Sequence, residues 1–245
     1  MKKLLPLALA MLLCLTAAAC GQTGDSTGEE ASDTDIDLVD PLPEDDSGTD
    51  TQPAAQDFTG LPLEQCVADA WPYDGVLAHI TLDCPGAEAI NAAIDEAFTE
   101  LADDPMWDVH YEVYKGAGRV LSVLMVQSGP NDVAYYPPYS LDLATGQALT
   151  GQELLDLLEV DAGELAELEL TVMGEEFDRL NAGARDSMED TKFYDGQRDA
   201  TIDPDNADTE RVWIGEGDQL YFAGRIYALA GAGYYEHALS TGLTF

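Results

Sequence analysis

The segment from Gly21 to Asp57 most limits what this chain can fold into. It contains 12 acidic residues and no basic residue, and it is rich in Ser, Thr, Gly and Pro. Such a segment repels itself and has too little apolar surface to offset the conformational entropy lost on folding. We therefore expect a disordered acidic linker over residues 20–57, with an end-to-end distance of at least roughly 35 Å. Folded structure is then expected in residues 58–245, as a single globular domain.

The body that follows the linker is also strongly acidic. Residues 58–245 carry 36 acidic and eight basic side chains, a formal charge of −28. This charge excludes a protein that grips the phosphate backbone of nucleic acid. A negative field of this size accelerates encounter with cationic partners, although acidity serves solubility equally well. The whole chain is 46% aliphatic, aromatic and Cys residues, which is normal for a folded protein.

The first twenty residues have the pattern of a secretory signal. Lys2 and Lys3 form a short basic start, and an apolar run of 16 residues extends from Leu4 to Ala19. This run is shorter than the roughly 20 apolar residues that a membrane-spanning helix needs. A signal peptide over residues 1–19 is therefore predicted, with a retained membrane helix as the alternative.

The small residues before Cys20 resemble the lipobox of bacterial lipoproteins, in which the Cys receives a diacylglycerol and cleavage occurs just before it. Ala17 stands where the lipobox usually has Leu. The resemblance implies that Cys20 is lipidated and that the mature protein is anchored on the extracytoplasmic face of the cell membrane. Two acyl chains on one Cys give a stable anchor. The alternative is ordinary cleavage after an Ala-x-Ala motif, which leaves Cys20 as a free thiol.

Two cysteines, Cys66 and Cys84, lie in the body. The alternating residues of Val76–Leu82 predict a half-buried strand, and Asp74-Gly75 is a strong hairpin-turn dipeptide. A hairpin that turns there places Cys66 within one residue of register with Cys84. In an oxidising compartment this proximity predicts a structural disulfide, which contributes about 3 kcal/mol in the chain-entropy model.

The next segments have clear helix and strand periodicities. Apolar residues spaced by three and four predict an amphipathic helix over residues 86–103. Alternation predicts a hairpin formed by 107–114 and 119–127, in which the second strand is apolar on both faces and therefore central. A strand is predicted over 139–143.

The C-terminal half predicts helices first and strands afterwards. Thr150 with Glu153, and Asp161 with Glu164, form capping pairs before two helices in series. A polar excursion over 181–208 separates these helices from a closing hairpin, 211–214 and 219–229, and from a last strand at 234–239. Because helices and strands occur in separate runs, we expect an α+β fold, with an antiparallel β-sheet and helices packed on one face.

The order of these segments resembles a known family. Residues 119–123, followed by Tyr139-Ser140-Leu141-Asp142-Leu143-Ala144-Thr145-Gly146-Gln147 and a leucine-rich helix, are similar to the extracytoplasmic domain of RsiV-type anti-sigma factors. The same module resembles the N-terminal region of a peptidoglycan N-acetylmuramic acid deacetylase. The resemblance covers residues 61–245 and implies a sensing or binding module, which in the anti-sigma version binds lysozyme. The family's Gly-Gly-x-His element is absent here, and residues 128–132 replace it.

Motifs for catalysis are not found. His79, His110 and His237 lie far apart in the sequence, and the chain has no Gly-x-Ser-x-Gly elbow, His-Glu-x-x-His motif or phosphate-binding Gly-rich loop. The acidic loop 203–208 departs from EF-hand spacing, so it is either a solvated loop or a weak calcium site. We expect no enzyme, no cofactor and no resident metal. With 36 acidic residues in the body, a carboxylate pair for glycoside hydrolysis stays open.

Three tyrosines are the candidate binding residues. Tyr135, Tyr136 and Tyr139 surround a Pro-Pro pair, and such a cluster suits stacking on sugar rings or anchoring of a protein partner. The alternative is that the prolines only begin an edge strand.

The sequence thus predicts a non-enzymatic, membrane-anchored lipoprotein that binds a cell-envelope component such as peptidoglycan, or a cationic protein such as lysozyme. The alternatives are an envelope glycan hydrolase or its accessory subunit, and a purely structural envelope lipoprotein.

Overall fold

Strand β4 (Val120–Ser128) organises the body because both of its faces are apolar, as its sequence predicts. In the computed structural model, which describes residues 56–71, 73, 76–130, 133–229 and 233–245, Leu121, Val123 and Met125 face one buried cluster. The side chains that alternate with them, Leu124 and Val126, face another. A strand with this pattern is covered on both sides, so β4 lies at the centre of the fold.

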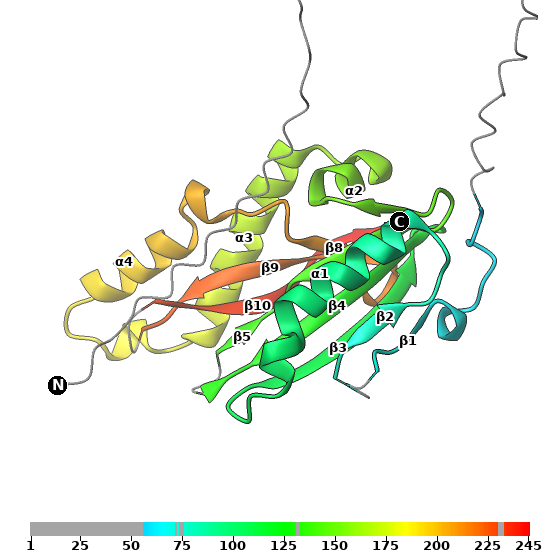
Figure 1. Cartoon of the computed structure of the whole chain (residues 1–245). Coiled ribbons are helices and arrows are strands. Elements are labelled where there is room, and N and C mark those ends of the chain that lie inside the picture. The colour runs from blue at the N-terminus through cyan, green and yellow to red at the C-terminus, as the bar shows by residue number, and fades with distance from the viewer. Residues whose placement is uncertain (1–55, 72, 74–75, 131–132, 230–232) are drawn as a thin grey trace, which may run out of the picture. The chain divides into compact units, whose positions relative to one another are not determined.

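The sheet that contains β4 has five strands. Its order is β3-β4-β6-β7, and β5 pairs with the end of β4. The helix α1 covers its outer face (Figure 1), where Ile90, Ile94 and Phe98 are buried at helical spacing. The hairpin of β1 and β2 joins the same cluster. The elements are β1 (Val67–Asp69), β2 (Ala78–Ile80), α1 (Pro85–Ala102), β3 (Asp108–Gly116), β5 (Ala134–Tyr135), β6 (Pro138–Asp142) and β7 (Gln147–Leu149).

A second large sheet has the order β10-β9-β8. Met173 and Phe177 of α3 pack on Phe222 of β9, and α4 lies beside α3 (Figure 1). On the other face of this sheet, Trp213 and Ala223 meet Leu124 and Val126 of β4. The elements are α2 (Gly151–Leu158), α3 (Ala162–Leu180), α4 (Lys192–Thr201), β8 (Val212–Ile214), β9 (Gln219–Tyr227) and β10 (Tyr234–Thr244).

The predicted α+β class is confirmed. All strand pairs described are antiparallel. The strands form two large sheets and one hairpin rather than one sheet. Each large sheet carries helices on one face only, because its other face packs against the other sheet.

The two helices after β7 each begin at a side chain that caps the helix. Thr150 and Glu153 form the predicted reciprocal capping box of α2. Asp161 accepts a hydrogen bond from the Glu164 backbone N–H at 2.9 Å and caps α3. Each bond satisfies a backbone N–H at a helix start that has no partner within the helix.

The polar stretch 181–208 was predicted to be an excursion, and this prediction is wrong for its second half. It contains α4, which buries Tyr194 and Thr201, and a short turn that buries Asn206. Thr201 Oγ1 accepts a hydrogen bond from the Tyr227 backbone N–H at 3.0 Å, and Asn206 Nδ2 donates to the Arg225 carbonyl oxygen at 2.9 Å. These two side chains thus form hydrogen bonds with backbone groups of β9 at residues that lie beyond its pairing with β8.

The predicted cysteine register is also wrong. The pairing of β1 with β2 places Thr81 next to Cys66, and the Thr81 N–H donates to the Cys66 carbonyl oxygen at 2.9 Å. Cys84 lies three residues further on, at the start of α1. Both side chains are buried in the cluster beneath α1. A disulfide between them stays a prediction.

Membrane attachment concerns a part of the chain that the structure does not describe. The signal peptide (1–19), Cys20 and nearly all of the linker lie outside the described residues. Within the described ranges, no helix has both the length and the apolar character that a membrane span requires.

Candidate functional site

The structure separates the three tyrosines that the sequence proposed as contacts. Tyr139 on β6 is opposite Val123 and packs on the cluster beneath α1, where burial raises its pKa to about 12. Tyr136 packs on the cluster between the two large sheets. Only Tyr135, on β5, counts as exposed, at 37%. The three side chains do not form one surface, because strand pairing turns them toward different neighbours.

Tyr135 lies at the end of the five-stranded sheet where β3 begins. The pairing register places Val109, Gln127 and Tyr135 in one row across β3, β4 and β5. The ring of Trp107, just before β3, has its centroid 6.4 Å from that of Tyr135. A Cβ atom at Gly129 would lie 2.3 Å from Trp107 Cζ3, so the ring covers this glycine. The Trp107–Tyr135 pair is therefore held by rigid sheet backbone.

Two further apolar side chains are exposed in neighbouring segments. Met106 directly precedes Trp107 and is 64% exposed, and Trp71, which follows β1, is 83% exposed. The Tyr111 hydroxyl of β3 donates a hydrogen bond to Asp69 of β1, which fixes the end of β1 beside β3. In Figure 1, β1 is labelled on the same side of β4 as β3, and β5 on the opposite side. We call Trp71, Met106, Trp107 and Tyr135 the aromatic end.

The segments that carry the aromatic end are also rich in acidic residues. The same segments contain the carboxylates of Asp69, Asp103, Asp104, Asp108 and Glu112. The chain has no Lys or Arg between Lys3 and Lys115, and Lys115 sits at the far end of β3, where its Nζ donates to the Thr59 and Leu61 carbonyl oxygens at 2.6 Å each. The segments of the aromatic end thus carry exposed apolar side chains and carboxylates, and no basic residue.

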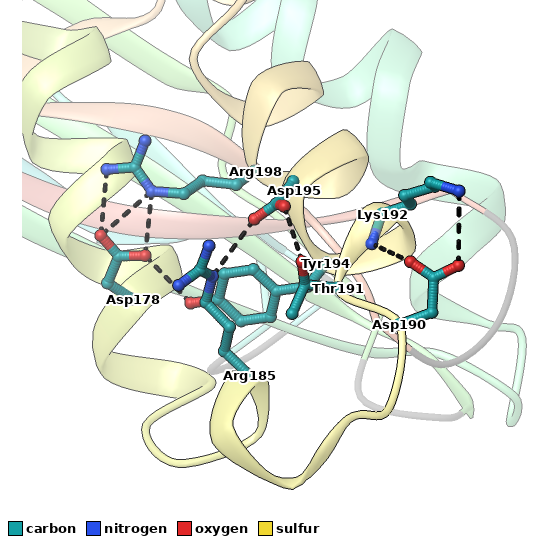
Figure 2. Close-up of polar contacts among 8 residues, drawn as sticks. All are labelled: Asp178, Arg185, Asp190, Thr191, Lys192, Tyr194, Asp195 and Arg198. Carbon is teal, nitrogen blue, oxygen red and sulfur yellow. Dashed lines mark hydrogen bonds and ion pairs between the residues drawn. The ribbon is translucent and has the colours of Figure 1, made fainter.

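The basic side chains of the body are concentrated elsewhere. Four of the eight lie between Arg179 and Arg198. Figure 2 shows Arg198 against Asp178, and Arg185 against Asp195, with N–O distances of 3.0 and 3.2 Å. The hydrogen bond from Arg198 lowers the pKa of Asp178. The first pair joins α4 to the end of α3, the second joins α4 to the turn that follows α3, and both neutralise the cations they contain.

A buried ionic network lies on the second large sheet, and sequence reasoning did not find it. Arg211 Nη1 and Nη2 donate to the two carboxylate oxygens of Glu236 at 2.6 and 2.7 Å. Arg225 Nη2 donates to Asp208 Oδ2 at 3.3 Å. Glu169 is fully buried, and its Oε2 accepts a hydrogen bond from the Asp208 N–H at 3.0 Å. Burial raises the pKa of Glu169 to about 7.

The histidines and the acidic loop make local contacts. Each His has a carboxylate neighbour, with N–O distances of 2.8 Å for His79 to Asp95, 3.7 Å for His110 to Asp108 and 3.8 Å for His237 to Glu176. In loop 203–208, Asp203 caps a turn and Asp208 pairs with Arg225. Across the described residues, no group of three or more His, Cys, Asp and Glu side chains is arranged to hold a metal ion.

No family model, curated protein or solved structure matches the chain. The resemblance to the RsiV-type domain therefore stays a prediction. Inference about function rests on the charge of the chain and on the side chains placed by its fold.

Proposed function

We propose that this protein is a non-enzymatic binding module that is held on the extracytoplasmic face of the cell membrane by a lipid on Cys20 and binds a cationic protein such as lysozyme. The observation that carries this proposal is the aromatic end, where exposed Trp71, Met106 and Tyr135 lie among carboxylates in segments without a basic residue.

The composition of the aromatic end suits a protein partner. Trp and Tyr are the side chains that most often dominate the free energy of binding at protein interfaces, and a polar rim around them excludes water. The Trp107 ring is packed over Gly129 before any partner arrives, so little conformational entropy remains to be lost. The carboxylates in the segments of the aromatic end and the charge of −28 on the body favour a basic partner through long-range attraction.

The buried carboxylates support a binding function over hydrolysis. Asp142 accepts hydrogen bonds from Arg119, Thr145 and the Ala144 N–H. Glu236 is held by Arg211, and Glu169 is sealed from solvent. A pair of carboxylates that hydrolyses a glycan must flank the scissile bond, and these three groups are instead engaged in holding the fold.

The lipid anchor is tested on the N-terminal peptide of the protein from its native membrane. We expect mass spectrometry to find residue 20 as the first residue, with its thiol joined to a diacylglycerol. The variant Cys20→Ser is expected to leave the membrane fraction, because it lacks the two acyl chains that give a stable anchor. An unmodified Cys20 thiol in membrane-derived protein would contradict the anchor but leave the binding proposal standing.

Binding is tested by calorimetry with the full chain and lysozyme. We expect a complex that weakens as salt concentration rises, because the attraction is screened. The double variant Trp71→Ala with Tyr135→Ala is expected to lose about 2 kcal/mol of binding free energy, roughly a 30-fold rise in Kd.

The control is Phe193→Ala, which removes an aromatic side chain on α4 that is 51% exposed. This variant is expected to bind lysozyme like the parent protein. Absence of lysozyme binding at low salt would refute the proposal. An equal loss of affinity in Phe193→Ala would show that the aromatic end is not the surface that binds lysozyme.

A further inference from the structure

A groove of about 440 Å³ lies between the start of α3 and the end of β10. Its floor is apolar and includes Leu158, Val160, Leu168 and Phe245. The first three are half-buried, and Phe245 is 39% exposed. On their inner side, Leu158 and Val160 pack on the cluster around α3 and β9. The floor is therefore a continuation of the core that remains open to solvent.

The rim of the groove is acidic. Glu159, Asp161 and Glu164 line it together with the floor, and no Lys or Arg is among the lining residues. Asp161 is used as the cap of α3. The carboxylates of Glu159 and Glu164 make no hydrogen bond or ion pair within the described part of the chain, and both residues are exposed. Two carboxylates are thus free to receive cations beside an apolar floor.

Glu159 occupies an unusual backbone position. Glu159 ends α2 in the left-handed conformation, with φ 57° and ψ 36°. This position at the end of a helix normally holds Gly, because a Cβ atom is disfavoured there. A Glu at this position therefore keeps a carboxylate on the rim of the groove at a cost to the backbone.

We propose that this groove binds an amphipathic basic segment of a partner polypeptide, with its apolar side chains on the floor and its Lys or Arg side chains against Glu159 and Glu164. The proposal rests on the proposed function and names a second region through which a cationic partner is held. Apolar anchors at helical spacing are the usual way in which a peptide helix occupies such a groove. The free carboxylates of the rim select basic segments over acidic ones.

The probe is a dye-labelled amphipathic peptide of Leu and Lys with the leucines on one helical face, titrated with the full chain and followed by fluorescence anisotropy. The double variant Glu159→Gln with Glu164→Gln is expected to raise the Kd of the peptide about tenfold. The matched control is Glu167→Gln with Glu175→Gln, which removes two exposed carboxylates from the same helix and none from the groove. We expect this control to change the Kd by less than about twofold.

The variant Glu159→Gly separates folding from binding. It is expected to unfold at a higher temperature than the parent, because Gly relieves the left-handed conformation, and yet to bind the peptide more weakly. A scrambled peptide with the same composition is expected to bind more weakly than the amphipathic one.

Two results would overturn the groove proposal and leave the proposed function intact. One is an equal loss of affinity in the rim variant and in its control, which would mean that only net charge is recognised. The other is binding of lysozyme without binding of the peptide. If neither lysozyme nor the peptide binds at low salt, the groove proposal and the proposed function both fail.

Discussion

Replacement of Arg211 by alanine is expected to lower the free energy of unfolding by about 3 to 5 kcal/mol. Arg211 donates two hydrogen bonds to Glu236, whose side chain is only 3% exposed. Without Arg211 the Glu236 carboxylate stays buried, loses both of these hydrogen bonds and keeps only the distant cation of Arg225, whose Nε is 4.0 Å away. Desolvation of a charge without a partner is among the largest penalties that one substitution can introduce.

Denaturant unfolding followed by tryptophan fluorescence measures this loss, and buried Trp213 is a suitable reporter. The double variant Arg211→Met with Glu236→Leu is expected to recover most of the stability, because it removes both charges and keeps apolar volume. Arg179→Ala is the surface control: Arg179 also pairs with a carboxylate, Glu176, but its own side chain is 68% exposed, so we expect a much smaller effect. Equal instability of the single and double variants would show that shape, not charge, is what Arg211 provides.

Glu169 is expected to make the protein less stable as the pH rises from about 4.5 to about 7. Burial raises the pKa of this carboxyl from 4.5 to about 7, and the neighbouring Asp208 carboxylate adds to the shift. Between these values the folded protein keeps a proton that the unfolded chain has released, so a rise in pH favours unfolding. The contribution of Glu169 is complete below about pH 4.5 and lost above about pH 7. Its size is on the order of 3 kcal/mol.

The variant Glu169→Gln isolates this effect. A neutral amide oxygen retains an acceptor for the Asp208 N–H, so the variant is expected to be more stable than the parent at pH 8 by on the order of 3 kcal/mol and to lose most of this advantage near pH 4.5. The difference between variant and parent is measured at each pH by denaturant unfolding. In this comparison the contributions of the other titrating groups cancel. They include His237, whose pKa is lowered by burial. A difference that stays constant with pH would mean that Glu169 does not titrate in this range.

The sequence predicts most of the helices and strands because their signals are local. The helix expected at 86–103 is α1, Pro85–Ala102, and the hairpin of 107–114 with 119–127 is β3 with β4. Both capped helices also begin where predicted. Periodicity, capping residues and turn glycines act within a few residues, so one sequence is enough to read them.

Features that depend on distant residues were not predicted. Alternation shows that a strand buries a face but not which element covers it, so the division into two large sheets was missed. The helix α4 is mostly polar and buries only Tyr194 and Thr201, which gives a weak pattern. Arg211 directly precedes β8 and Glu236 lies on β10, so the two are brought together only by the pairing of both strands with β9.

The role of the three tyrosines as contacts stays a prediction. Tyr135 is exposed and its ring lies 6.4 Å from that of Trp107, whereas Tyr136 and Tyr139 pack on two other clusters. Which tyrosines reach solvent depends on strand register, and a run of aromatic residues around prolines does not determine that register. The sequence does contain one signal for an acidic region. It has no Lys or Arg between Lys3 and Lys115, so the first part of the body presents none of these cations.

The contacts from α4 to β9 cover part of a strand edge. An unpaired strand edge is a template for pairing with another molecule. Here the side chains of Thr201 and Asn206 form hydrogen bonds with backbone groups of β9 at Tyr227 and Arg225, beyond the residues that β8 pairs with. A proteolytic cut that released α4 would uncover this part of the edge and is expected to promote pairing with a second copy of the chain.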